Sequence, residues 1–224
     1  MRSLPLPLAL TARLTPVVVL ACAGWAMTSG PDADAQDGAS KDTQKTQSEK
    51  KDSDGGSSEA AVSKTYDTAL APCTSVAVKT ITALVPGAKT AGKEIPSTDT
   101  KLRRTCSWNA LKGFDYRWLD ISFEITDSDA EAQSSYTDRL KEKSGGGDVP
   151  GLGDAGYSVV NLTTEDKQQT REGTVIARVS NALVVVTYNG SDFESKKAPS
   201  TDVINKGAIK AAKEAVAALQ KSAG

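Results

Sequence analysis

Histidine is absent from this chain of 224 residues. Its absence excludes the Ser-His and Cys-His pairs of nucleophilic enzymes, and it removes the commonest general base and the commonest metal ligand. The G-x-S-x-G motif of many hydrolases is also missing. We therefore expect a protein that is not an enzyme, with no catalytic residue, no metal site and no cofactor.

An excess of one charge is missing as well, because 27 Lys and Arg residues face 28 Asp and Glu residues. The longest basic runs of the expected globular part are the pairs Arg103-Arg104 and Lys196-Lys197. Nucleic acid and other anionic surfaces reward a concentrated basic patch. The sequence therefore predicts no nucleic-acid partner, and it does not favour an anionic surface as the main partner.

Long apolar runs are scarce, and the one near the N-terminus covers residues 14–27. This run is shorter than the roughly 20 residues that an ordinary transmembrane helix needs. Arg2 and Arg13 precede it, and a basic start followed by a short apolar run is typical of a secretory signal. We expect residues 1–27 to be a signal peptide.

The end of that run, Val19-Leu20-Ala21-Cys22, resembles a bacterial lipobox. The resemblance implies that Cys22 is lipidated and becomes the mature N-terminus, which would hold the protein on the outer face of the cytoplasmic membrane. The alternative is ordinary cleavage at an A-x-A site, after Ala23 or Ala35, which would release a secreted protein.

Apolar side chains are absent from the next segment, since residues 29–61 contain no Val, Ile, Leu, Met, Phe, Trp, Tyr or Cys. Such a segment cannot bury enough apolar surface to offset the entropy lost on ordering. We expect residues 28–64 to be a disordered tether whose ends lie about 30 Å apart. Residues 65–224 are then one globular domain.

Cysteine is rare, with Cys22, Cys73 and Cys106 as the three examples. Outside the cytoplasm, an even number of cysteines in a folded domain indicates pairing. If Cys22 is lipidated or removed, Cys73 and Cys106 can pair and leave no free thiol.

Three helices are expected in the globular part. The first covers residues 73–87, with Thr74 or Ser75 as its cap, and the second follows a capping box formed by Ser128 and Glu131. The third covers residues 200–220. Its apolar stripe at helical spacing consists of Val203, Ile204, Ile209, Ala212, Val216 and Leu219.

Strands are expected between these helices. Residues 106–109 and 116–126 form the first two, and in the second Leu119, Ile121, Phe123 and Ile125 alternate with polar residues. Residues 156–162 form another, and residues 173–189 form a hairpin that turns at Ser180-Asn181. The order predicts the α+β class, an antiparallel sheet covered by helices and stapled by one disulfide.

The segment 151–156 matches the G-x-G-x-x-G pattern of dinucleotide sites. A dinucleotide site requires a strand directly before the glycines and a helix opening within them. Here Pro150 and a Gly-rich loop come before, and a strand is expected after. We interpret the glycines as a turn that leads into the strand.

Four aromatic residues are the candidate binding surface: Trp108, Phe114, Tyr116 and Trp118. The alternation places Tyr116 and Trp118 on the face opposite the Leu119–Ile125 stripe. Trp and Tyr favour surfaces that are half apolar and half polar. The alternative interpretation is a second core layer packed under a helix or a loop.

Four short motifs stand out along the expected domain: Pro72-Cys73, LVPG at residues 84–87, CSW at residues 106–108 and VPGLGDAGY at residues 149–157. Through these motifs the chain resembles an uncharacterised family of actinobacterial lipoproteins that is known only as a domain of unknown function. The resemblance implies a lipid-anchored envelope protein with a Cys73–Cys106 disulfide, and it supplies no catalytic residues.

Two functions fit these observations. The first is a non-enzymatic interaction domain in the cell envelope, held at the membrane by its N-terminal lipid and engaging an envelope protein. The second is a carrier of a small molecule or lipid, with a pocket between sheet and helices lined partly by Trp118 and Tyr116.

Overall fold

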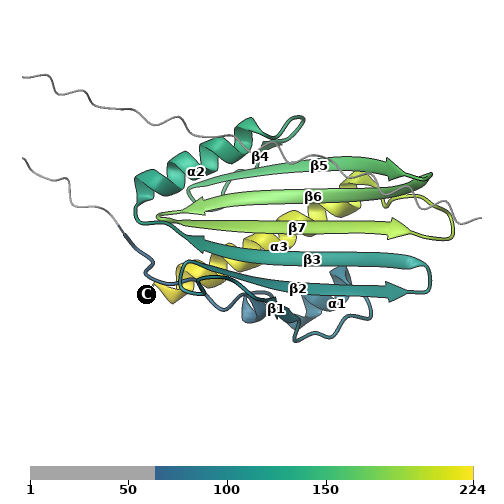
Figure 1. Cartoon of the computed structure of the whole chain (residues 1–224), viewed down its shortest axis with the longest axis horizontal. Coiled ribbons are helices and arrows are strands. Elements are labelled where there is room, and N and C mark those ends of the chain that lie inside the picture. Colours follow the sequence, from purple (N-terminus) through teal and green to yellow (C-terminus); the bar gives the residue numbers. More distant parts are fainter. Residues whose placement is uncertain (1–63, 224) are drawn as a thin grey trace, which may run out of the picture. The chain divides into compact units, whose positions relative to one another are not determined.

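A computed structural model of the protein describes residues 64–223 (Figure 1). The predicted signal peptide, Cys22 and all of the predicted tether except Lys64 lie outside the described residues. Within residues 64–223, no helix is both long enough and apolar enough to cross a membrane.

The domain is built on one antiparallel sheet of seven strands in the order β1-β2-β3-β7-β6-β5-β4. With three α-helices and one disulfide, it confirms the predicted α+β class. The strands are β1 (Lys93–Ile95), β2 (Arg103–Lys112), β3 (Asp115–Ile125), β4 (Gly147–Asp148), β5 (Ala155–Glu165), β6 (Gln168–Val179) and β7 (Ala182–Asp192).

Alternation along β3 gives the sheet two different faces, as the sequence predicted. Leu119, Ile121 and Phe123 are completely buried on one face, which we call the core face. Trp118 and Asp120 point to the opposite face, which we call the open face. Both neighbours of β3, β2 and β7, pair with it along its length, so this strand fixes the register of the sheet's centre.

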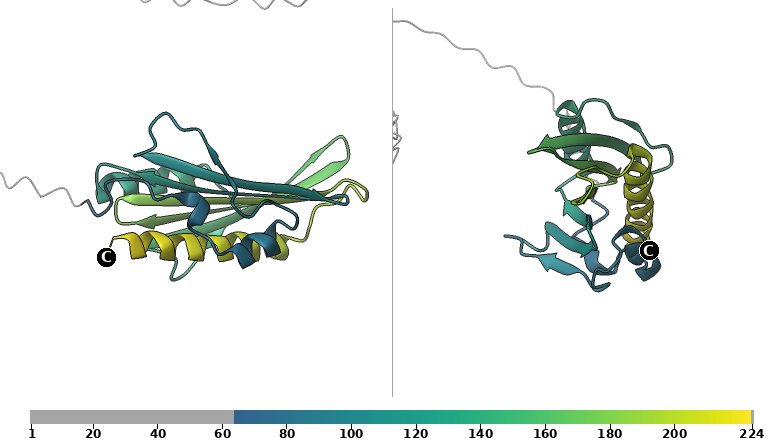
Figure 2. Two further views of the ribbon diagram at one scale, coloured as in Figure 1. Left: turned by 90° about the horizontal axis from the view of Figure 1, so that it is seen from below. Right: turned by 90° about the vertical axis from the view of Figure 1, so that its right-hand side faces the viewer.

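Two helices cover the core face, α3 (Thr201–Ser222) and the short α1 (Val78–Leu84) (Figure 2). The contact between α3 and the sheet is close: a Cβ added at Gly207 would lie 2.6 Å from the Tyr188 ring. Ser200 caps α3 by accepting the N–H of Val203. Val203 itself is 52% exposed, so its predicted place in the apolar stripe is wrong.

The first predicted helix begins later than expected. A single 3-10 turn, Pro72–Thr74, comes first, and α1 starts only at Val78. Neither Thr74 nor Ser75 caps α1, so that prediction is wrong. The N–H of Ala77 donates instead to the carboxylate of Glu214 on α3, at 2.9 Å. A partner distant in sequence therefore replaces the local cap.

The third helix, α2 (Asp129–Lys141), packs on the open face over β6 and β7 (Figure 1). The predicted capping box is confirmed, because Ser128 Oγ accepts the Glu131 N–H at 3.1 Å. Arg139 of α2 forms an ion pair with Glu124 of β3. Tyr136 packs against two buried open-face residues, Ile176 and Leu183.

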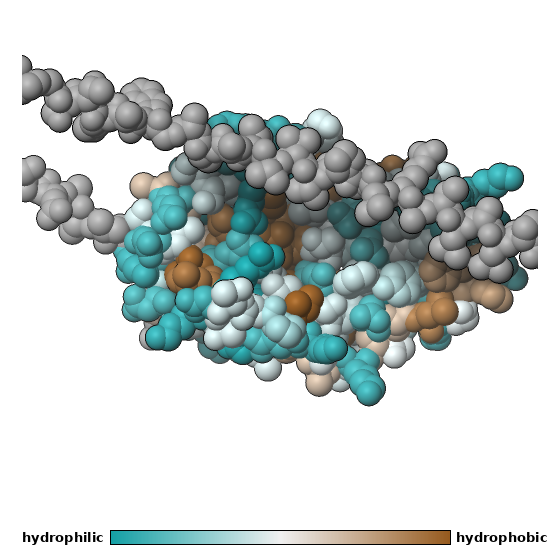
Figure 3. All heavy atoms as spheres, in the orientation of Figure 1, coloured by the Kyte–Doolittle hydropathy of each residue, from teal (hydrophilic) through white to brown (hydrophobic). Residues whose placement is uncertain are grey.

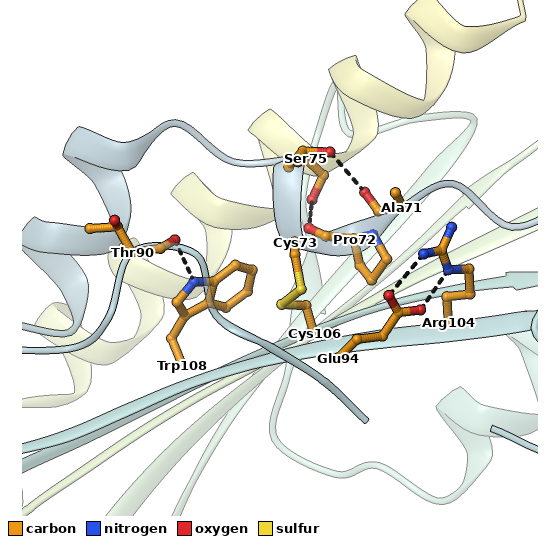
Figure 4. Close-up of a disulfide and its surroundings, with 10 residues drawn as sticks. Ala71, Pro72, Cys73, Ser75, Thr90, Glu94, Arg104, Cys106 and Trp108 are labelled. Carbon is orange, nitrogen blue, oxygen red and sulfur yellow. Dashed lines mark hydrogen bonds and ion pairs between the residues drawn. A yellow bond between two sulfur atoms is a disulfide. The ribbon is translucent and has the colours of Figure 1, made fainter. Parts of the chain in front are cut away.

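The disulfide between Cys73 and Cys106 ties the 3-10 turn to β2, as predicted (Figure 4). Cys106 is fully buried beside Gly92, where an added Cβ would lie 2.6 Å from its sulfur. The glycine, at φ +67°, permits this close approach of the chain to the disulfide.

The β6–β7 hairpin turns at Ser180-Asn181, as predicted. Asn181 is fully buried, and its amide binds the backbone of Thr65, Tyr66 and Thr126. One side chain thus joins the hairpin turn, the end of β3 and the start of the domain.

Two short edge strands, β1 and β4, were not predicted, because two or three residues carry no detectable alternation. The hairpin predicted to end at residue 189 extends to Asp192, so Asn189 and Gly190 lie inside β7. Gly190 packs closely there: an added Cβ would lie 2.5 Å from the Arg117 guanidinium and 2.9 Å from the Pro199 ring.

Candidate functional site

Part of the open face has no helix above it. The helix α2 packs on β6 and β7, and no described helix lies in front of β2 and β3 in Figure 1. Four exposed large apolar side chains, Leu111, Phe114, Trp118 and Phe193, lie near the turn of the β2–β3 hairpin. We call these four, together with the half-buried Tyr116, the aromatic end.

The aromatic end is exposed to solvent. The exposed fractions are 57% for Leu111, 54% for Phe114, 37% for Trp118 and 47% for Phe193. Figure 3 shows brown, hydrophobic atoms at the right-hand end of this face, where Figure 1 places the β2–β3 turn. Soluble domains commonly expose apolar side chains singly, so a group of this kind is a candidate contact surface.

Backbone pairing holds the aromatic end together. Leu111 pairs with Tyr116 across the β2–β3 hairpin. The turn between these strands is Gly113-Phe114, and its first residue has the positive φ, +62°, that a two-residue hairpin loop requires. The Phe193 N–H donates to the Phe114 carbonyl at 2.9 Å, which brings the segment after β7 to the same place.

Ring contacts complete the arrangement. The rings of Tyr116 and Phe193 are tilted by 31° with centroids 6.0 Å apart, a favourable aromatic distance. Burial raises the pKa of Tyr116, and the carboxylate of Asp120 raises it further. The Tyr116 hydroxyl therefore stays protonated at neutral pH.

A separate surface groove of about 600 Å³ lies near the start of β2, and no residue of the aromatic end lines it. Ile95 and Leu102 line it, together with Arg103, Thr105 and Asp120. Asp120 connects the two regions, since its carboxylate accepts the Trp118 Nε1–H at 2.6 Å. This bond fixes the Trp118 indole and gives the surface a polar border next to its apolar part.

The structure removes Trp108 from the candidate surface. Trp108 points to the core face, is 1% exposed, and donates its Nε1–H to the Thr90 carbonyl at 3.0 Å (Figure 4). Trp108 lies two residues after Cys106 on β2 and points to the same face, so it packs beside the disulfide. The other three predicted residues, Phe114, Tyr116 and Trp118, do lie together.

The predicted carrier pocket has no place in this arrangement. Val175, Val184 and Val186 of the sheet and Ala208 and Ala211 of α3 are completely buried in one cluster. These side chains fill the space between sheet and helix where the pocket was expected. Trp118 and Tyr116, its expected lining, are on the opposite face.

The G-x-G-x-x-G segment is a packed turn between β4 and β5, and no helix opens within it. Gly153 has φ +64°, and an added Cβ would lie 2.4 Å from the Arg178 carbonyl oxygen. Asp154 accepts the Ser180 N–H at 2.6 Å and pairs with Arg178. The segment is a turn that leads into β5, as the sequence context predicted.

Across residues 64–223, no group of three or more His, Cys, Asp or Glu side chains is arranged to hold a metal ion.

Two members of the aromatic end were missed from the sequence, Leu111 and Phe193. Leu111 could have been found from the alternation of side chains along its strand. It lies an odd number of positions from Cys106 and Trp108, so it points to the opposite face of the sheet. Phe193 follows the last residue of β7, and only the turn geometry brings it next to Phe114.

Comparison with known proteins gives little similarity. No family model and no curated protein matches the chain. A solved structure from Bacteroides thetaiotaomicron matches with 11% identity and a TM-score of 0.30, covering 50% of each chain. The extracellular domain of PknH from Mycobacterium tuberculosis matches with 12% identity and a TM-score of 0.30, covering 53% of this chain and 64% of that one. The chain thus spans less than two thirds of either structure, and scores this low support no functional argument.

Proposed function

We propose that this protein is a lipid-anchored, non-enzymatic interaction domain of the cell envelope that binds another envelope protein through the aromatic end. The observation that carries the proposal is the aromatic end itself. Two distant chain segments bring exposed Leu111, Phe114, Trp118 and Phe193 together on a part of the sheet that no described helix covers.

The composition of this surface fits a protein partner. Aromatic residues are enriched at the centres of protein interfaces, where water is excluded. Asp120, whose carboxylate accepts the Trp118 Nε1–H, provides a hydrogen-bonding group at the border of this surface, as such centres have. A small molecule would need a concave apolar pocket instead.

The extracytoplasmic location rests on the cysteines. A disulfide in a small domain forms and persists in oxidising compartments. Cys73 and Cys106 are paired, which leaves Cys22 for the lipid that the lipobox-like sequence implies. The apolar-free segment 29–61 would then separate the domain from the bilayer.

Photo-crosslinking in native membranes tests the partner. A photoreactive phenylalanine analogue is placed at Phe114, at Phe193, or at Ser134 on α2 as a control. All three side chains are exposed, so substitution should leave the fold intact. We expect one reproducible protein adduct from positions 114 and 193 and none from 134. Adducts equally strong at 134, or absent everywhere, would contradict the proposal.

The mass of the N-terminal peptide from membrane-extracted protein tests the anchor separately. Lipidation predicts a peptide that begins at a diacylated Cys22. A peptide that begins after Ala23 or Ala35 without lipid would refute the anchor and leave the interaction surface untouched.

A further inference from the structure

The outer surface of the helix layer carries a group of lysines. Lys206, Lys210 and Lys213 lie on α3 at positions i, i+4 and i+7, a spacing that places them on one side of the helix. Lys79 lies on α1, which covers the same face of the sheet (Figure 2). All four side chains are exposed.

The acidic groups of this surface are already engaged. Asp202 pairs with Lys206 at 2.5 Å. Glu214 accepts the N–H of Ala77 at 2.9 Å and the hydroxyl of Thr80 at 2.7 Å, which holds the start of α1 against the middle of α3. The four lysines outnumber the two carboxylates, Asp202 and Glu214, so the surface has a net positive charge. Within residues 64–223, Lys79, Lys210 and Lys213 form no ion pair.

Aliphatic side chains lie among these lysines. Val78 of α1 is 61% exposed and Val203 of α3 is 52% exposed. Between the lysines a shallow groove of about 440 Å³ has Ile209 in its lining. Lysines with exposed aliphatic neighbours are the composition that favours the headgroup region of an anionic bilayer.

We propose that this helix layer adsorbs to an anionic lipid surface. The 22-residue α3 extends about 33 Å and forms one layer with α1, which suits an extended planar partner more than a compact one. The apolar side of α3 is used by the sheet, so binding is electrostatic and does not require insertion of the helix.

The orientation of the domain on the bilayer that this adsorption implies would leave the aromatic end free to bind a protein. Helices α1 and α3 lie on the core face of the sheet (Figure 2), whereas Tyr116 and Trp118 point to the open face. Adsorption through the lysines would therefore turn the open face away from the bilayer. The inference does not depend on the protein partner. It revises the expectation drawn from short basic runs, because the fold collects lysines that are separate in the sequence.

Amine labelling of the full chain tests the proposal. The protein is mixed with vesicles of equal phosphatidylglycerol and phosphatidylcholine, or of phosphatidylcholine alone, and acetylation rates are measured for each lysine. In anionic vesicles we expect Lys79, Lys210 and Lys213 to be acetylated at least fivefold more slowly, and high salt should restore their rates. Lys141 and Lys143, near the end of α2, should not change.

A matched pair of variants supplies the second measurement. Lys206, Lys210 and Lys213 are changed to Gln in one variant, and Lys101, Lys141 and Lys143 in the other. At about 1 kcal/mol, or fivefold, for each lysine, the first triple variant should lose about 100-fold in affinity for anionic vesicles. The second should lose less than tenfold.

Three results would overturn the proposal. One is equal labelling in both kinds of vesicle, and another is slowing that includes Lys141 and Lys143, which would mean adsorption without orientation. The third is protection by soluble polyglutamate but not by anionic vesicles, which would assign the surface to an acidic protein.

Discussion

Changing Asn181 to Ala should destabilise the domain more than the small loss of side-chain volume indicates. The Asn181 amide oxygen accepts the N–H groups of Thr65 and Tyr66 at 2.9 and 2.8 Å. Its NH₂ group donates to the carbonyls of Tyr66 and Thr126 at 2.8 and 2.9 Å. The alanine variant removes all four bonds from a position that is completely buried.

The magnitude follows from the groups left without partners. Thr65 is exposed, so water can replace its bond. Both bonds to Tyr66 are buried, and a buried polar group without a partner costs about 1–3 kcal/mol. We expect a loss of about 4 kcal/mol, which lowers Tm by about 8–16 °C in a domain of this size.

Urea unfolding followed by tryptophan fluorescence measures this loss, since Trp108 is buried and reports on the core. The matched control is Asn161→Ala on β5. That side chain is exposed and makes no hydrogen bond to another described residue, so the change should stay within about 0.5 kcal/mol. A loss below about 1 kcal/mol for Asn181→Ala would refute the reasoning, because water would then be replacing the amide.

Three further predictions concern the frame of the domain. Changing both Cys73 and Cys106 to Ala opens a loop with a sequence separation of 33, so the free energy of unfolding should fall by about 4 kcal/mol. Urea unfolding measures this loss, and a value below about 1 kcal/mol would contradict the prediction. Hydrogen bonds from Arg104 lower the pKa of Glu94 below 4.5 (Figure 4). The stabilisation that these bonds give the fold is therefore present above pH 4.5, and it is lost as the pH falls through the lowered pKa of Glu94. Acid unfolding should therefore be steeper for the wild type than for Glu94→Gln, and identical curves would contradict it. Gly153→Ala should cost more than about 1 kcal/mol in thermal unfolding, whereas Gly147→Ala, which has open space around it, should be nearly neutral; equal effects would contradict the packing argument.

The strand pattern was readable from the sequence because each central strand buries one face. The alternation around Leu119 and Ile121 predicted which side of β3 is buried, and the structure has that arrangement. The Ser128 capping box and the turn at Ser180-Asn181 were equally readable, because their hydrogen bonds are formed by neighbours in sequence. Helix α1 was not, because Glu214, 137 residues from Ala77, satisfies its first turn.

The aromatic end could be predicted only in part, because some of its contacts join residues that are distant in the sequence. Tyr116 and Trp118 share a strand face, so period-two alternation placed both correctly. Trp108 was grouped with them by composition, although its parity on β2 follows that of buried Cys106. Phe193 reaches the surface through the packing of a segment after β7, and no local pattern encodes that contact.

Binding of an envelope protein by the aromatic end can be tested through the crosslinking yield at position 114. The yield is measured in native membranes, first in the wild-type background and then with Trp118→Ala and Phe193→Ser added. Both added changes affect exposed side chains, so the fold should be retained. If the surface binds as one unit, the yield of the adduct falls at least tenfold. An unchanged yield would mean that the adduct records chance contact, and it would contradict the account.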